Sequence, residues 1–252
     1  MKFEPEKQSA NGGSRRRLTL VRNATLILEL NGLRLLVDPM LDAAGARPPV
    51  ENTANELRNP LVELPFPAEQ VVRDIDAVLV THLHRDHFDD TAARLLPRDV
   101  PVFCQPEDEE RLGRIGLQAR PVAQSTEFDG LQITRTDGQH GVGEVARNLA
   151  PVSGFVVGGV YIAGDTIWCE EVDQAIQHHK PSVVVVNGGG ARFVDSEPIV
   201  MTVSDISEVL ARVQTVVVVH LEAINHCFDS RELVRSRVPD AIVPDDGEAV
   251  DL

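Results

Sequence analysis

The sequence predicts an α/β protein with a four-layer αββα sandwich fold, in which two facing β-sheets are covered on their outer sides by helices. Stretches rich in strands and stretches rich in helices alternate twice along the chain, in two halves of similar length. The nearly continuous apolar runs over 182–186 and 215–219 are typical of strands buried on both faces. In such a sandwich the polar residues that follow the strands gather along one edge, where we expect the functional site.

The composition is that of a globular protein with a sizeable core. Its 252 residues, 42% of them hydrophobic, suffice for one large domain, which we expect over residues 18–252. Residues 1–17 are polar, lack the apolar core of a secretion signal and predict a disordered tail. A net charge of −15 argues against nucleic acid and anionic membranes as partners. The three cysteines are far apart and form no CxxC pair, so we expect reduced thiols in a cytoplasmic protein.

The first half of the chain is predicted to consist mainly of strands, with short helices between them. Asn31-Gly32 predicts a tight hairpin turn, because both central residues of such a turn must accept positive φ. The other elements follow from apolar runs bounded by turn residues and from apolar residues at helical spacing. We expect strands over 18–21, 24–30, 33–37, 77–80, 101–104, 119–122 and 131–136, and helices over 69–75, 90–96 and 107–115.

The second half is predicted to open with a hairpin and then to alternate helices and strands. The glycines Gly188–Gly190 follow an apolar strand, and they form either a cradle of backbone N–H groups for an anion or a tight turn. We expect strands over 155–157, 160–162, 182–186, 215–219 and 241–243, helices over 170–179, 203–213 and 230–238, and an acidic tail over 245–252.

A long segment over 40–67 is rich in Pro and Asn and has no clear periodicity. Structureless stretches of this length inside a domain are usually lids or binding loops, so we place it over the site. The alternative is a surface loop with no role in the site. Just before it, Asp38 at a strand exit either fixes an imidazole of the site or caps the next loop. The polar contributors expected from the segment are Asn52, Asn55, Arg58 and Asn59.

The strand over 77–80 ends in a cluster of metal-binding residue types. The six residues that follow Thr81 include His82, His84, Asp86 and His87. Metal sites need imidazoles and carboxylates that converge on one point, and a strand that opens into a loop can supply them. Residues i and i+2 share a face of an extended segment, so His82 and His84 can hold one metal. Asp86 and His87 lie past the bend and can reach a second.

Later strand exits carry further candidate ligands. His140, in a glycine-rich loop, is suited to supply a third imidazole to the first metal, against the alternative of a lone surface histidine. Asp165 either points back over the sheet edge or serves as N-cap of the helix over 170–179. His220 ends an apolar strand and is the better terminal ligand; the alternative is His226, which could instead contact a substrate.

The spacing Thr-His-x-His-x-Asp-His at 81–87 resembles the signature of the metallo-β-lactamase superfamily. The resemblance covers about residues 18–244 and is closest to the lactonase-like and phosphodiesterase-like hydrolases, which share Asp38-Pro39 and the strand exit at His220. It implies the αββα fold and two divalent metal ions. By this resemblance metal one is held by His82, His84 and His140, metal two by Asp86, His87 and His220, and both are bridged by Asp165. Nitrogen and oxygen ligands with no cysteine favour Zn²⁺, with Mn²⁺ or Fe²⁺ as alternatives.

The implied activity is that of a dinuclear metal-dependent hydrolase. Two close cations lower the pKa of a bridging water to near 7, and the resulting hydroxide attacks a small-molecule ester, lactone or phosphodiester. Asp86 would act as the catalytic residue that orients this nucleophile and shuttles its proton. Some phosphodiesterase relatives carry a histidine where this chain has Met201-Thr202, which weakens a transfer of phospholipid specificity.

Two other classes of function remain open from the sequence. A non-catalytic metal-binding sensor would keep the fold and some ligands, and an iron-dependent redox enzyme would use the same scaffold with a different metal. We expect a small molecule rather than nucleic acid or a membrane as partner, and the sequence leaves homo-oligomer formation open.

Overall fold

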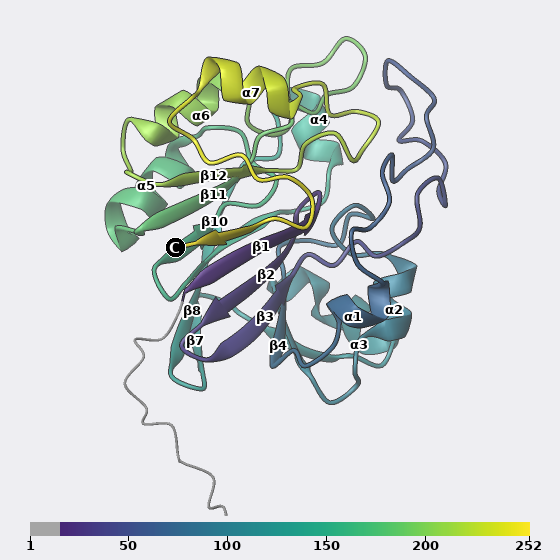
Figure 1. Ribbon diagram of the computed structural model, residues 1–252, viewed down its shortest axis with the longest axis vertical. Coiled ribbons are helices and arrows are strands. Elements are labelled where there is room, and N and C mark those ends of the chain that lie inside the picture. Colours follow the sequence, from purple (N-terminus) through teal and green to yellow (C-terminus); the bar gives the residue numbers. More distant parts are fainter. Residues whose placement is uncertain (1–15) are drawn as a thin grey trace, which may run out of the picture.

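The computed structural model describes residues 16–252 and shows two β-sheets packed face to face, with helices on both outer sides (Figure 1). One cluster of buried apolar side chains lies between the two sheets. A second cluster joins one sheet to its covering helices, and a third does the same for the other sheet. These layers confirm the predicted αββα sandwich.

The first sheet has seven strands in the order β13-β1-β2-β3-β4-β5-β6. Strands β1 to β3 are antiparallel, whereas β3 to β6 are parallel, so the latter end at the same edge. The strands are β1 (Arg17–Arg22), β2 (Thr25–Leu30), β3 (Leu33–Val37), β4 (Ala77–Val80), β5 (Pro101–Cys104), β6 (Gln118–Pro121) and β13 (Ala249–Asp251). The helices of this half are α1 (Ala68–Val71), α2 (Asp90–Leu95), the 3-10 helix η1 (Pro106–Asp108) and α3 (Glu109–Arg114).

The second sheet has six strands in the order β12-β11-β10-β9-β8-β7, with β10, β11 and β12 parallel. Its strands are β7 (Ser125–Phe128), β8 (Leu131–Asp137), β9 (Ser153–Val157), β10 (Val160–Ile162), β11 (Val183–Asn187) and β12 (Val216–Val219). The helices of this half are α4 (Gly143–Asn148), α5 (Glu170–His179), α6 (Val203–Leu210) and α7 (Arg231–Arg237). No helix among the described residues is long and apolar enough to cross a bilayer.

Local sequence signals account for several element boundaries. Asn31 and Gly32 adopt φ of 53° and 84° in the turn that joins β2 to β3, as their residue types predict. Helix α2 begins where the Asp89 side chain accepts a hydrogen bond from Ala92 N. Helix α6 begins at a capping box, in which Thr202 and the side chain three residues later satisfy each other's backbone N–H.

The structure differs from the sequence prediction at several places. The final strand lies at 249–251, inside the expected acidic tail, where it pairs with β1; the expected strand over 241–243 forms only a single bridge, at Ile242. Strand β7 and helix α4 were not predicted, and the helix expected over 69–75 ends at Val71. Of the tail expected over 1–17, residues 1–15 lie outside the described residues, whereas Arg17 already belongs to β1.

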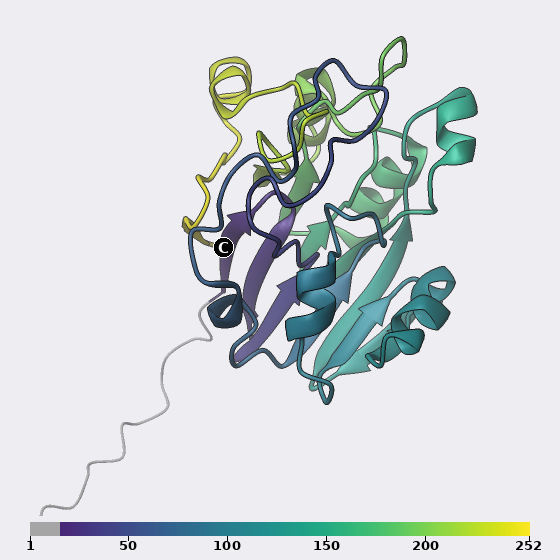
Figure 2. The ribbon, with the colours of Figure 1, turned by 90° about the vertical axis from the view of Figure 1, so that its right-hand side faces the viewer.

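The segment over 40–67 contains no helix or extended strand (Figure 2). Two buried polar side chains, Arg22 and Asn225, hold it in place. Arg22 is fully buried, and its guanidinium donates to the carbonyl oxygens of Met40, Asp42 and Val62, each at 2.9 Å. Asn225 holds the middle of the segment: its side-chain oxygen accepts from Val50 N and Asn59 Nδ2, and its side-chain nitrogen donates to Thr53 Oγ1. The segment is therefore fastened over the carboxyl ends of the strands.

Candidate metal centre

All seven predicted ligands converge on the edge where the parallel strands of both sheets end. The stretch that follows β4 supplies four of them, and the exits of β8, β10 and β12 supply one each. They form two groups whose candidate ligand atoms lie within 4.8 Å of one another. The first ligand group is His82, His84, His140 and Asp165, and the second ligand group is Asp86, His87, Asp165 and His220.

Asp165 is common to both ligand groups, and its two carboxylate oxygens face different groups. Oδ2 lies 3.8 Å from Nε2 of His82 and 3.8 Å from Nε2 of His140. Oδ1 lies 3.2 Å from Nε2 of His87 and 3.7 Å from Nε2 of His220. A carboxylate in this position can bind one cation through each oxygen.

The remaining ligands complete the two groups at similar spacing. In the first group, His84 Nδ1 lies 3.0 Å from His82 Nε2. In the second group, Asp86 Oδ2 lies 3.2 Å from His220 Nε2. Asp165 does not cap the helix that follows: the N-cap of α5 is Cys169, and no side chain caps that helix.

Hydrogen bonds behind the imidazoles hold four of them with Nε2 facing the centre. Such contacts fix the tautomer and the orientation of a ligating histidine. The partners of Nδ1 are Thr81 Oγ1 for His82 (3.1 Å), Asp38 Oδ2 for His87 (2.7 Å), the Ile199 carbonyl oxygen for His140 (2.8 Å) and Cys227 Sγ for His220 (3.4 Å).

Asp38 orients imidazoles of both ligand groups. It contacts His87 directly, and it accepts a 2.7 Å hydrogen bond from the hydroxyl of Thr81, which lies against His82. The backbone N–H of Thr81 donates to its other oxygen. Of the two interpretations of this residue, the structure therefore favours the one in which it fixes an imidazole.

Asn187, the last residue of β11, is a site residue that the sequence interpretation missed. Its Nδ2 donates to Asp165 Oδ1 at 2.6 Å, and it is buried. The available signal was a polar residue at the exit of an apolar strand, the same signal that identified His220.

The three glycines after Asn187 are packed rather than open to a ligand. A Cβ added at Gly188 would lie 2.4 Å from Val218 Cγ1, so only glycine fits there. The backbone N–H groups of Gly188 and Gly190 donate to the carbonyl oxygens of Val219 and Met201. The structure therefore favours a tight turn over the anion cradle.

Burial and charge shift the pKa values of the histidines in opposite directions in the two ligand groups. Burial, together with the neighbouring imidazole of His87, lowers the pKa of His82 well below its usual value. Burial alone would also lower the pKa of His87, but the carboxylates of Asp165 and Asp38 outweigh it and raise that pKa to about 10. Likewise, burial opposes ionisation of Asp165, whereas His87 and His220 hold its pKa well below the usual range.

The residues present fit a pair of divalent cations. His87 Nε2 is buried and makes no well-aligned hydrogen bond with the described residues, although Asp165 Oδ1 lies 3.2 Å away, so it is available to bind a cation beside that carboxylate. The donors are imidazole nitrogens and carboxylate oxygens, the set that zinc and related metals bind in catalytic sites. Asp165 between the groups supplies the shared ligand that two adjacent cations require.

Metal binding is expected to release protons and to weaken as the pH falls. In the metal-free protein, His87 and His220 are protonated at neutral pH because their pKa values are raised, and a metal binds only the neutral imidazole. The lowered pKa values of His82 and His84 leave those rings neutral, with no proton to release. Calorimetry with Zn²⁺ at about pH 7.5, in buffers of different ionisation enthalpy, should show release of about two to three protons per chain, two from these rings and most of one from the water whose pKa the cations lower to near 7. Binding without proton release would contradict this assignment.

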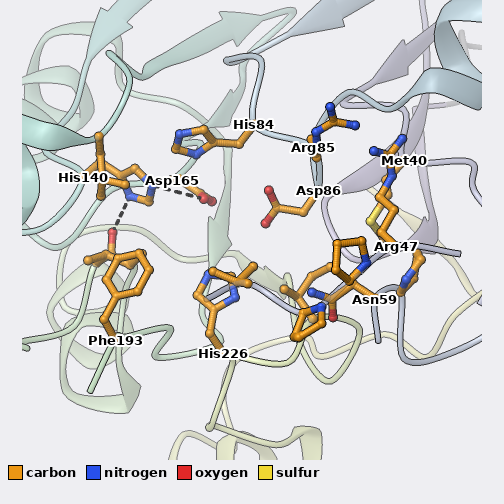
Figure 3. Close-up of a pocket in the computed structure, with 17 residues that line it drawn as sticks. Met40, Arg47, Asn59, His84, Arg85, Asp86, His140, Asp165, Phe193 and His226 are labelled. Atoms are coloured by element: carbon orange, nitrogen blue, oxygen red, sulfur yellow. Dashed lines mark hydrogen bonds and ion pairs between the residues drawn. The ribbon is translucent and has the colours of Figure 1, made fainter. Parts of the chain in front are cut away.

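A cavity of about 550 Å³ opens above the metal centre (Figure 3). Its walls are mainly apolar, and His84, Asp86, His140 and Asp165 reach its floor. Part of its wall comes from the segment over 40–67, which was predicted to lie at the site. The other side chains that line the cavity are Met40, Arg47, Pro48, Pro49, Val50, Asn59, Pro60, Arg85, Leu149, Phe193, Ile199, Ile224 and His226.

The polar contributors expected from the covering segment are only partly correct. Asn59 lines the cavity, and Arg47 does so although it was not predicted. Asn55 and Arg58 instead make internal hydrogen bonds, Asn55 to the carbonyl oxygen of Asn225 and Arg58 to those of two neighbouring loop residues. Asn52 is not among the lining residues.

Comparison with known proteins agrees with this geometry. A family model described as a beta-lactamase superfamily domain matches residues 33–221, which include all seven candidate ligands. The chain belongs to the metallo-β-lactamase superfamily. Within this superfamily it is similar to the UPF0173 protein YddR of Bacillus subtilis, with 37% identity over 92% of this chain and 98% of the relative.

Solved structures of the superfamily show the same arrangement of layers. A structure described as a possible metal-dependent hydrolase from Veillonella parvula matches with a TM-score of 0.91 and 31% identity, over 94% of this chain and 100% of that chain. An isothiocyanate hydrolase from Delia radicum gut bacteria matches with a TM-score of 0.88 and 35% identity, over 94% and 99%.

Proposed function

We propose that this chain is a dinuclear metal-dependent hydrolase that acts on a small, mostly apolar molecule, with Zn²⁺ as the metal that best suits its ligands and Mn²⁺ or Fe²⁺ as alternatives. The observation that carries the proposal is the position of Asp165, which offers one carboxylate oxygen to each of two ligand groups. The similarity to proteins named metal-dependent hydrolases supports the reaction type.

Two divalent cations, when bound, supply Lewis acidity and lower the pKa of a water molecule to near 7. The chain's own residues then position the reactants. Asp86 lines the cavity and belongs to the second ligand group with His220, so one of its carboxylate oxygens would hold a cation while the other can orient the water and take its proton. The segment over 40–67 supplies part of the cavity wall beside this floor.

The cavity favours neutral substrates over phosphodiesters. Its two lining arginines are already paired with carboxylates: Arg47 contacts Asp42 and Asp90, and Arg85 lies 3.3 Å from Asp90. The other walls are chiefly proline, aliphatic and aromatic side chains. An ester or lactone with an apolar tail therefore fits this environment better than an anionic phosphodiester.

A second candidate substrate class is an isothiocyanate. The similar isothiocyanate hydrolase shares 35% identity over nearly its whole length. In such a reaction water adds to the central carbon of R–N=C=S, the carbon–nitrogen bond breaks, and the products are an amine and carbonyl sulfide. The small electrophilic carbon and the apolar R group match the metal centre and the cavity walls, respectively.

A substrate screen tests the proposed function. Metal-reconstituted protein is assayed against aryl esters, lactones, alkyl and aryl isothiocyanates, thioesters, amides and bis(p-nitrophenyl) phosphate. We expect turnover of one or more neutral classes, with kcat/KM of about 10⁴ M⁻¹s⁻¹ or more for the preferred class. A protein that holds two metal ions and hydrolyses no member of the panel would contradict the proposal and favour a sensor.

A further inference from the structure

His226 is a buried histidine in the cavity wall that belongs to neither ligand group. Its side chain is 6% exposed, and it projects into the cavity between Phe193 and Asn59, facing the floor formed by Asp86 and Asp165 (Figure 3). The last ligand is instead His220, six positions earlier in the chain. The ring is therefore close to the reacting centre without being a metal ligand.

The ring of His226 is held in place but has no hydrogen-bond partner. Phe193 stacks on it, with centroids 6.2 Å apart and ring planes 20° from parallel. Its backbone carbonyl accepts from Arg192 N, and Asn225 next to it is tied to the covering segment. Yet Nδ1 is buried with no partner among the described residues, and no hydrogen bond found there involves this ring.

A fixed polar ring without a partner is suited to a ligand. Nδ1 has almost no exposed surface, so a ligand in the cavity can reach only Nε2, for which no hydrogen bond to the described residues is found. A polar atom left unpaired at a cavity wall is available to a ligand. Burial lowers the pKa of His226 to about 4, so the ring is neutral and can donate one N–H without adding charge to an apolar cavity. A neutral donor of this kind suits an oxygen or nitrogen atom that gains negative charge.

We propose that His226 donates a hydrogen bond to the substrate atom that leaves with the bonding electrons. This inference rests on the proposed function. In an ester or lactone, the water oxygen bonds to the carbonyl carbon, the bond from carbon to the leaving oxygen breaks, and that oxygen takes the electron pair. Asp86 takes the proton of the attacking water and returns it to the leaving oxygen, which His226 holds. For an isothiocyanate the leaving atom is the nitrogen that becomes the amine.

Two substitutions separate this role from packing. His226→Phe keeps a flat ring on Phe193 and removes both polar atoms, whereas His226→Gln keeps a hydrogen-bond donor. The matched control is His178→Gln, at an exposed histidine of α5 away from the metal centre. Each variant is loaded with Zn²⁺, its metal content is measured, and it is assayed with substituted phenyl acetates whose phenols span a range of pKa values.

We expect His226→Phe to retain both metals and to lose about 100-fold in kcat for phenyl acetate, the poorest leaving group of the series. For p-nitrophenyl acetate, whose leaving group needs little help, the loss should be less than about fivefold. The plot of log kcat against leaving-group pKa is therefore steeper in this variant. His226→Gln should recover part of the activity, and His178→Gln should match the wild type.

An equal loss for all leaving groups would show a packing role and overturn the inference, as would activity unaffected by the substitution. Loss of metal from His226→Phe would make the residue a ligand and would also overturn it. Absence of wild-type activity toward the whole series is a different result: it contradicts the ester form of the proposed function, and this inference fails with it.

Discussion

Replacing Asp165 by alanine is expected to abolish hydrolysis and to lower the bound metal from two ions to one or fewer per chain. Its two carboxylate oxygens face different ligand groups, so the substitution removes a ligand from each. It also removes one of the two carboxylates that each of the rings of His87 and His220 contacts, leaving Asp38 beside His87 and Asp86 beside His220. Because each cation contributes several kcal/mol to catalysis, the rate should fall by about 1000-fold or more.

Metal analysis and steady-state kinetics on the same preparation measure both effects. The matched control is Asp173→Ala in α5, whose carboxylate pairs with Arg212 on the surface. That variant should keep both metals and nearly all activity, since surface ion pairs contribute little. Normal turnover and two bound metals in Asp165→Ala would contradict the dinuclear centre.

Removal of metal from the wild-type protein is expected to have the second large effect. Dialysis against a strong chelator should eliminate activity, and back-titration with Zn²⁺ or Mn²⁺ should restore it with saturation near two equivalents. The ions would also join the two sheets, because His82, His84, Asp86 and His87 follow β4 whereas the other three candidate ligands follow β8, β10 and β12. At a free metal concentration about 100 times the dissociation constant, each site adds about 2.7 kcal/mol, so we expect the Tm to rise by about 10 to 20 °C when both sites are filled.

The stoichiometry of this titration separates the three classes of function that the sequence left open. Two zinc or manganese ions with restored turnover support the hydrolase. Redox-active iron with oxygen-dependent chemistry would favour an oxidising enzyme. Substoichiometric metal without turnover would favour a sensor and contradict the proposed function.

Much of the fold follows from local features of the sequence. The apolar runs that became β4, β11 and β12 are four or five residues long, rich in valine and bounded by polar residues, which favours a buried strand over a helix. β13 was missed because Ala249–Asp251 carries almost no strand signal of its own. Its pairing depends on the open edge of β1, more than two hundred residues earlier in the chain. Such long-range pairing is not visible in a local pattern.

The candidate ligands could be located from sequence for a similar reason. Each follows a predicted strand, and the carboxyl ends of parallel strands lie at the same edge of a sheet. The supporting contacts were harder to identify. Asn187 looks like the start of a glycine turn, and its bond to Asp165 appears only when β10 and β11 lie side by side. The partner of Asp38 could not be chosen, because the sequence does not place His87 within its reach.

The attachment of the segment over 40–67 bears on how the protein turns over. Arg22 binds both ends of this segment, and Asn225 binds its centre, all through hydrogen bonds to groups of the chain itself. Displacing the segment would break several of these bonds together, so we expect it to stay in place during turnover. The size of the molecules that reach the metal centre should then be limited by the walls that this segment supplies.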